Sequence, residues 1–182
     1  ITCLVEGEFM QMEDVYRIDQ GIERYMTKTQ KKTADFMEGC MELGGLLGDW
    51  QEDEIIELKK YGHALGMAFQ ITDDIMDYRE TAETTGKPVG NDLREGLLTY
   101  PLLSIVNDGN KDKLLEDIKG LNNGGNEQDI IDYVIAQGGI DNTLAVADKY
   151  CKDALAALAA VRDFPGKEFL VMAVENLADR KV

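Results

Sequence analysis

The chain has 182 residues, of which 44% are apolar, enough to form the core of one globular domain or of a large part of a bigger protein. Its formal net charge of -16 argues against binding to nucleic acid through general electrostatics, because a phosphate backbone is normally met by a basic protein surface. A phosphate-bearing partner must therefore be held through metal ions or through a local basic patch.

The cysteines and the apolar runs indicate the cellular compartment. Cys3, Cys40 and Cys151 are far apart and form no C-x-x-C pair, so neither a disulfide framework nor a zinc site is predicted. No apolar run reaches transmembrane length, and the first residues lack the features of a secretory signal. We therefore predict a cytoplasmic protein. The sequence begins with isoleucine rather than methionine, which suggests a missing N-terminal part.

Apolar residues recur at helical spacing almost throughout, which predicts an all-α protein of one domain over residues 1–182. In chain order we expect helices over residues 2–16, 18–27, 30–47, 51–82, 100–106, 128–137, 140–161 and 167–180. The glycines and the proline of residues 84–96 predict a polar loop after the fourth helix. Residues 120–127, GLNNGGNE, have the composition of a flexible loop.

The fourth helix carries an acidic turn near its end. Asp73, Asp74 and Asp77 follow Gln70 at spacings of three and four residues, so the four side chains project toward one side of a helix. A solvated acidic face explains a bare D-D-x-x-D equally well, because like charges at this spacing cost only about 0.2–0.5 kcal/mol per pair. Spacing alone therefore leaves both interpretations open.

The surroundings of the acidic turn favour a metal site. The helix is mostly apolar behind the turn, and the loop that follows carries Lys87, Asp92 and Arg94. Carboxylates that are held together raise one another's proton affinity unless a cation is present. Oxygen ligands without a nearby histidine or cysteine indicate a hard cation, Mg²⁺ first and Mn²⁺ second. Since Mg²⁺ often shares its ligand shell with substrate phosphates, an acidic protein could bind a diphosphate in this way.

Several motifs, taken as an ordered set, resemble the trans-type prenyl diphosphate synthases. The second aspartate-rich motif of that family and its downstream loop resemble F-Q-x-x-D-D-x-x-D at 69–77, G-K-P at 86–88, D-L at 92–93 and T-Y-P-L at 99–102. K-T-A at 32–34 resembles the family's lysine and threonine pair, and G-E-x-x-Q at 7–11 resembles the stretch before it. The resemblance covers nearly the whole chain.

The resemblance implies an isoprenoid-synthase-type helical bundle around a central cavity, with two aspartate-rich motifs across its mouth. The motif in this chain is similar to the second, and no earlier D-D-x-x-D occurs. The chain is thus expected to be the C-terminal part of such a domain, without its N-terminal helices. The implied activity is the Mg²⁺-dependent condensation of isopentenyl diphosphate with an allylic diphosphate, by a homodimer or heterodimer. This fragment alone is expected to be inactive.

The resemblance also assigns metal ligands. Asp73 would bind Mg²⁺, and Asp74 and Asp77 would complete or order its ligand shell. Asp92 would hold a metal-bound water. The family commonly has a lysine that contacts the diphosphate where this sequence has Leu97, so other lysines would have to take a larger share of that role.

Further residues are expected at the reacting groups. Lys32 and Lys87 would contact the diphosphate of the allylic substrate. Gln70 and the main chain at Thr33 would lie beside the developing allylic cation, and Phe69 would pack against the isopentenyl group. Without the resemblance, the basic run that contains Lys32 would be read as a solvated surface.

Two other functions are compatible with the fold. A non-catalytic or regulatory subunit of a heteromeric synthase would usually carry a broken motif, and Asp73, Asp74 and Asp77 are intact. A terpene cyclase is disfavoured because Lys32-Thr33 and Gly86-Lys87 match the synthases. The length of the product is not predicted, although the motifs look most like those of bacterial medium- to long-chain synthases.

Overall fold

The computed structural model describes residues 1–79 and 90–179. Within these ranges all regular secondary structure is helical, which confirms the predicted all-α class. The α-helices are α1 (Thr2–Glu13), α2 (Gly21–Thr29), α3 (Asp35–Leu47), α4 (Glu52–Arg79), α6 (Asn91–Glu95), α7 (Tyr100–Leu103), α8 (Lys111–Gly120), α9 (Glu127–Ala136), α10 (Gly139–Ala159) and α11 (Lys167–Asp179). A π-helix, η1 (Gln30–Ala34), joins α2 to α3, and a 3-10 helix, η2 (Leu121–Asn123), follows α8.

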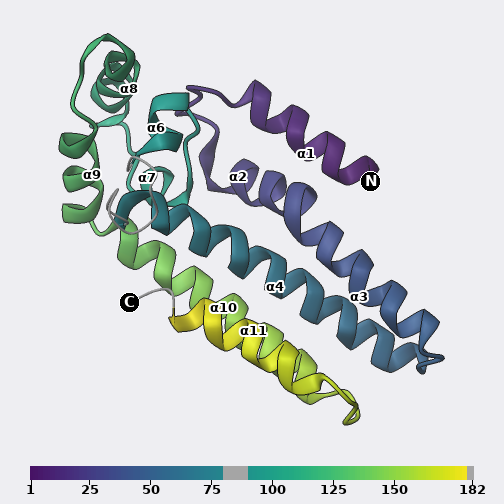
Figure 1. Cartoon of the computed structure of the whole chain (residues 1–182). Helices are drawn as coiled ribbons and strands as arrows, with labels where there is room; N and C mark the ends of the chain where they lie inside the picture. Colours follow the sequence, from purple (N-terminus) through teal and green to yellow (C-terminus); the bar gives the residue numbers. More distant parts are fainter. Residues whose placement is uncertain (80–89, 180–182) are drawn as a thin grey trace.

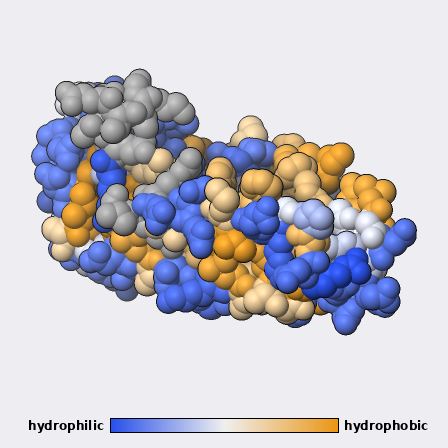
Figure 2. Space-filling model, turned by 60° about the horizontal axis from the view of Figure 1, so that its bottom comes forward, coloured by the Kyte–Doolittle hydropathy of each residue, from blue (hydrophilic) through white to orange (hydrophobic). Residues whose placement is uncertain are grey.

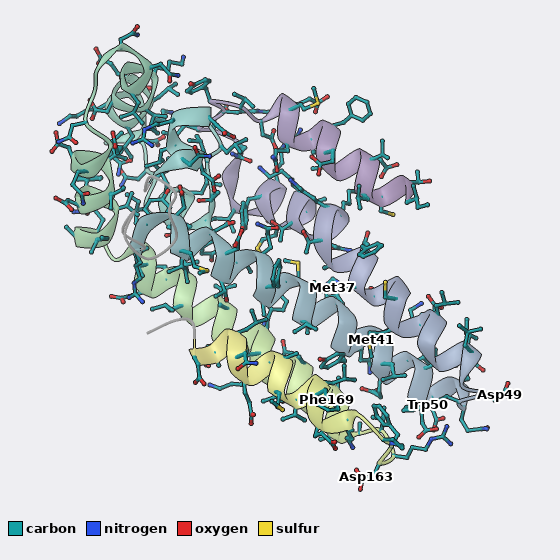
Figure 3. All side chains as sticks on the ribbon, in the orientation of Figure 1. Met37, Met41, Asp49, Trp50, Asp163 and Phe169 are labelled. Carbon is teal, nitrogen blue, oxygen red and sulfur yellow. The ribbon has the colours of Figure 1, made fainter. Side chains whose placement is uncertain are left out.

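Helix α4 is the longest described element and packs between α3 and α10 (Figure 1). Three acidic residues occupy its first turn, where the helix dipole favours negative charge. Close packing against α3 requires a glycine at position 62, because a Cβ atom there would lie 2.7 Å from the carbonyl oxygen of Met37. Met37 and Met41 lie on the part of α3 that crosses this position (Figure 3).

The far end of the bundle is closed by aromatic contacts. Trp50, in the connection between α3 and α4, lies near Asp163 in the connection between α10 and α11 (Figure 3). The rings of Trp50 and Phe164 meet edge to face with centroids 4.9 Å apart. The guanidinium of Arg162 lies 4.5 Å from the Trp50 ring centroid, a favourable cation–π arrangement. These contacts fix the two helix pairs to each other.

The other end of α4 is surrounded by the short helices. Helices α6, α7, α8 and α9 gather there, while α1 lies along α2 (Figure 1). Ile71 and Ile75 of α4 belong to one buried core with Leu93, Leu98 and Leu102. The segment that leads into and out of α6 is therefore anchored on α4 by apolar packing, and this places Asp92 beside the acidic turn.

Two helices present apolar side chains to solvent. Val5, Phe9 and Met12 form a stripe on α1, and Phe36 and Leu43 are exposed on α3. Figure 2 shows that hydrophobic residues also reach the surface on the face that it displays. Each described helix is too short or too polar to cross a lipid bilayer.

The helix boundaries differ from the predictions at several places. The first helix ends at Glu13 instead of residue 16. Its C-cap residue, Asp14, already departs from helical geometry with ψ of 3°, and Tyr16 is left-handed with φ of 57°. Helices α6 and α8 were not predicted, and the expected loop at 120–127 contains η2, whose Leu121 is buried. Helix α4 is described as far as Arg79, so its predicted end at residue 82 lies outside the described residues.

Candidate metal and diphosphate site

The acidic turn at the end of α4 places its aspartates in different environments. Asp73 is exposed, whereas Asp74 is only 3% exposed. Neighbouring residues on an α-helix point about 100° apart, so one side chain turns into the bundle while the other faces outward. Among the described residues, no side chain or main-chain group donates a hydrogen bond to Asp73. Its carboxylate is the one best placed to meet an ion from solvent.

Asp74 is held inside the bundle by uncharged donors. The hydroxyl of Tyr25 donates to its Oδ2 at 2.5 Å, and Nε2 of Gln70 donates to its Oδ1 at 3.2 Å. The backbone of Tyr100 also favours the charged form of this carboxylate and so lowers its pKa. Burial raises the pKa of Asp74 to about 6, although these hydrogen bonds favour the charged form. The side chain is thus fixed in place, and its oxygens are already in use.

Asp77 caps the short helix α6. Its two carboxylate oxygens accept the backbone N–H groups of Asn91 at 3.0 Å and of Asp92 at 3.1 Å. Its main-chain carbonyl also accepts the N–H of Gly90, at 3.0 Å. A carboxylate at a helix N-terminus satisfies free N–H groups and interacts well with the helix dipole. Asp77 therefore ties the start of α6 to α4.

Asp92, held at this place by the cap, is surrounded by negative charge. Burial is the largest cause that raises its pKa to about 7, followed by the charges of Asp77, Asp74 and Asp73. Burial also raises the pKa of Asp77. Among the described residues, the ion pairs that form involve none of these four carboxylates, although the charge of Arg94 lowers the pKa of Asp77. A set of oxygen donors in which acids outnumber nearby cations fits a hard divalent cation such as Mg²⁺.

The four carboxylates do not yet converge on one point. In the described part of the chain, the one group of three ligand atoms that all lie within 4.8 Å of one another is formed by Asp35, Glu38 and His63, on α3 and α4. Mg²⁺ keeps several of its waters in protein sites, and bridging waters can span the wider spacing at the end of α4. The role of Asp73, Asp74, Asp77 and Asp92 as metal ligands stays a prediction.

Lys32 lies on η1, where α1 crosses it. Its ammonium donates to Oε1 of Gln11 at 2.9 Å and lies 3.3 Å from Oε1 of Glu8. A Cβ atom at Gly7 would come within 2.7 Å of the Lys32 backbone nitrogen, so only glycine permits this crossing. The fold thus brings together the G-E-x-x-Q stretch and the lysine that the sequence analysis connected by resemblance. A π-helical turn is often found at functional sites.

The remaining predicted residues are distributed around this position. The hydroxyl of Thr33 donates to Oε1 of Gln70 at 3.1 Å, which links η1 to α4. Phe69 is 39% exposed. Leu97 is half-buried, and its backbone N–H donates to the carbonyl of Asp92 at 2.8 Å. Lys87 lies outside the described residues.

Tyr25 was not among the predicted site residues. The helix that carries it changes to the π-helix η1 before Lys32, so the seven-residue separation from Lys32 does not indicate a shared face. The contact of Tyr25 with Asp74, 49 residues away, depends on how α2 packs and has no local signal.

Comparison with known proteins agrees with this architecture. A profile of the polyprenyl synthetase family matches residues 1–137. The chain is 33% identical over 155 residues to heptaprenyl diphosphate synthase component 2 of Geobacillus stearothermophilus, a match that covers 85% of this chain and 48% of that protein. It is 33% identical over 175 residues to octaprenyl diphosphate synthase of Escherichia coli, covering 94% of this chain and 54% of that protein.

Solved structures give the same result. The fold matches heptaprenyl diphosphate synthase from Staphylococcus aureus with a TM-score of 0.86 and 28% identity, over 100% of this chain and 57% of that one. It matches polyprenyl synthase from Caulobacter crescentus, complexed with calcium and isoprenyl diphosphate, with a TM-score of 0.86 and 29% identity, over 100% of this chain and 56% of that one. The chain spans about half the length of the curated relatives that it matches. It belongs to the polyprenyl synthetase family.

Proposed function

We propose that this chain supplies the second metal and diphosphate site of a trans-prenyltransferase, which condenses isopentenyl diphosphate with an allylic diphosphate to give a longer polyprenyl diphosphate. The observation that carries the proposal is the group of carboxylates at the end of α4, where Asp77 holds the backbone of Asp92 beside the acidic turn and where burial and neighbouring aspartates raise the pKa of Asp92 to about 7. The relative from Caulobacter crescentus supports it, because that protein was solved with a divalent cation and an isoprenyl diphosphate.

The roles that we propose for the acids follow from their different environments. Asp73, which is exposed, would bind Mg²⁺ or Mn²⁺ directly. Asp77 would hold α6 so that Asp92 can bind a water of the metal shell, and Asp74 would order the turn from inside. Bound Mg²⁺ would act as a Lewis acid that stabilises the charge of the departing diphosphate, an effect of several kcal/mol.

The other residues would bind and orient the substrates. Lys32, which Gln11 and Glu8 hold by their side chains, would contact the allylic diphosphate, and so would Lys87. Gln70 and the main chain at Thr33 would lie beside the developing cation, where a carbonyl dipole is favourable. The exposed ring of Phe69 would pack against the isopentenyl group and help to exclude water, which would capture the cation.

A second candidate is a subunit that needs another chain for activity. Its support is the similarity to a protein named heptaprenyl diphosphate synthase component 2, since the word component indicates an enzyme of more than one part. In this case the carboxylates would still bind Mg²⁺ with a diphosphate, while elongation would require a partner. A homodimer or a heterodimer is compatible with either function.

An elongation assay separates these functions. Labelled isopentenyl diphosphate and farnesyl diphosphate, with Mg²⁺, would be given to the 182-residue chain and to a version extended upstream. We expect product from the extended version and none from the short chain, because one carboxylate cluster leaves the transition state without metal ions on its other side. Elongation by the short chain would contradict the proposal that these residues supply only the second metal and diphosphate site. Product from neither version, combined with Mg²⁺-dependent diphosphate binding, would favour the subunit.

A further inference from the structure

Tyr25 is a buried polar residue to which the proposed chemistry gives no role. Its side chain is 2% exposed, and its hydroxyl donates to Oδ2 of Asp74 at 2.5 Å. The ring packs edge to face against Tyr100, with centroids 5.6 Å apart. The ammonium of Lys28 lies 5.8 Å from the centroid of the same ring. Because these contacts hold the Tyr25 ring on several sides, its hydroxyl has a fixed position.

Asp74, which Tyr25 holds in place, in turn fixes the orientation of the Gln70 side chain. A carboxylate can only accept hydrogen bonds, so the amide of Gln70 must present its NH₂ group to Asp74, which it does at 3.2 Å. Its carbonyl oxygen then faces the other way and accepts the hydroxyl of Thr33 at 3.1 Å. Rotation of the amide by 180° would place an oxygen against the carboxylate and an NH₂ group against Thr33. The amide therefore has one favourable orientation.

We infer that Tyr25 is a positioning residue, which acts through Asp74 to keep the amide oxygen of Gln70 turned toward Thr33. The chain of hydrogen bonds runs from α2 through α4 to η1 and involves Tyr25, Asp74, Gln70 and Thr33. An amide oxygen has two lone pairs, and Thr33 uses one of them. The second is available to a developing positive charge.

The consequence for catalysis rests on the proposed function, in which Gln70 lies beside the allylic cation. A correctly oriented carbonyl dipole stabilises the cation without reorganisation during the reaction, whereas a mobile amide would have to be ordered first. Loss of the Tyr25 hydroxyl should therefore slow the chemical step and leave substrate binding nearly unchanged. A purely structural tyrosine would not show this separation.

Tyr61 offers a matched control on the same bundle. It is as deeply buried as Tyr25, and its hydroxyl donates to the carbonyl of Leu170 at 2.9 Å, in the far half of the molecule. Tyr25→Phe and Tyr61→Phe each remove one buried hydroxyl and keep the ring. Both variants should lose comparable stability, and only Tyr25→Phe should affect Gln70.

The first experiment uses the 182-residue chain and needs no activity. The side-chain amide resonances of Gln70 would be recorded by ¹⁵N–¹H NMR and assigned by their absence in Gln70→Ala. We expect Tyr25→Phe to shift or broaden this amide pair and Tyr61→Phe to leave it in place. An unchanged Gln70 amide in Tyr25→Phe would overturn the inference.

The second experiment uses the upstream-extended protein in the elongation assay. Tyr25→Phe should lower kcat about tenfold, the size of one lost hydrogen bond, with less than a twofold change in KM for farnesyl diphosphate. The double variant Tyr25→Phe/Gln70→Ala should be no slower than Gln70→Ala, because the two residues act as a unit. Additive losses, or an unchanged kcat in Tyr25→Phe, would contradict the inference. If the extended wild-type protein makes no product, the proposed function fails, and the NMR experiment still decides the role of Tyr25.

Discussion

Two buried aspartates, Asp14 and Asp74, differ in the charge of the side chains that surround them. Asp14 is 1% exposed and lies 2.6 Å from Arg24, 3.6 Å from Arg17 and 3.9 Å from Lys28. Asp74 is 3% exposed and has only uncharged donors around it. The protein thus places basic side chains within ion-pair distance of one buried acid. In the described part of the chain the other acid makes no ion pair, and the charge of Lys28 acts on it only from a greater distance.

The difference separates a structural acid from a functional one. A buried charge is normally stabilised by an opposite charge, as Asp14 is. The carboxylates of α4 and α6 instead raise one another's pKa. Such an arrangement costs stability unless a cation arrives from outside. We therefore expect removal of the charge to destabilise the fold at Asp14 and to stabilise it at Asp92.

The largest change in stability is expected when the charge of Asp14 is removed. Asp14→Asn would remove the buried carboxylate that Arg24 contacts at 2.6 Å and that also lies near Lys28, which is 7% exposed, and we expect a loss of about 3 kcal/mol in the free energy of unfolding. Urea denaturation followed by circular dichroism would measure it. Glu13→Gln is the matched control, because Glu13 also pairs with Arg24, at 2.8 Å, but is exposed. The control should lose less than about 1 kcal/mol, and equal losses would remove the distinction.

At Asp92 we expect removal of the charge to increase the free energy of unfolding. Without divalent metal at pH 8, Asp92→Asn should stabilise the fold by about 1.4 kcal/mol, the value of a single pKa unit, since solvent screens part of the charge at this half-buried side chain. Glu116→Gln, a change at an exposed acid of α8, should alter stability by only a few tenths of a kcal/mol. A destabilised Asp92→Asn protein would mean that its charge is compensated after all.

The same variant should show a distinct pH dependence. The pKa of Asp92 is about 7 in the folded chain, against 3.8 for an ordinary aspartate, so the folded state binds more protons between these values. Stability of the wild type should then fall as pH rises from about 4 to about 7. The advantage of Asp92→Asn should be small at pH 4 and largest above pH 7, as measured by urea denaturation in the presence of a chelator.

These contrasts also show what the sequence could predict. Helical spacing was sufficient for α4 and α10, since their buried residues recur over long segments without a helix-breaking proline. It did not predict α6, a helix of five residues whose cap, Asp77, lies 14 residues before its first residue. For α8, the apolar positions Leu114 and Ile118 did give a helical signal four residues apart, but they stand among charged residues and were not interpreted as a helix.

The sequence predicted which residues form the candidate site, but it did not predict how their side chains are arranged. The motif indicated that Asp73, Asp74 and Asp77 belong together, yet equal residues at neighbouring positions proved to have unequal environments. The reason is tertiary: Tyr25 and the backbone of Tyr100 surround Asp74, and both come from other helices. Spacing along one helix cannot indicate which side a second helix covers.

A smaller effect on diphosphate binding is expected at Leu97, where a lysine would add a positive charge next to Asp92, whose carbonyl already accepts the backbone N–H of this residue. Leu97→Lys should tighten the binding of magnesium pyrophosphate by about 1 kcal/mol, if the ammonium makes one charge-assisted contact. Isothermal titration calorimetry on the wild type and the variant would measure this difference. Unchanged affinity would show that the side chain at position 97 does not face the diphosphate.

The most direct test of the central claim is calorimetric titration of Mg²⁺ and inorganic pyrophosphate into the chain, its Asp73→Ala variant and its Glu38→Gln variant. The comparison distinguishes the carboxylates at the end of α4 from the separate group of Asp35, Glu38 and His63. We predict binding by the wild type and by Glu38→Gln, and at least about tenfold weaker binding by Asp73→Ala, because its charged contact to the metal is lost. Equal binding by wild type and Asp73→Ala, or loss of binding in Glu38→Gln alone, would contradict the account.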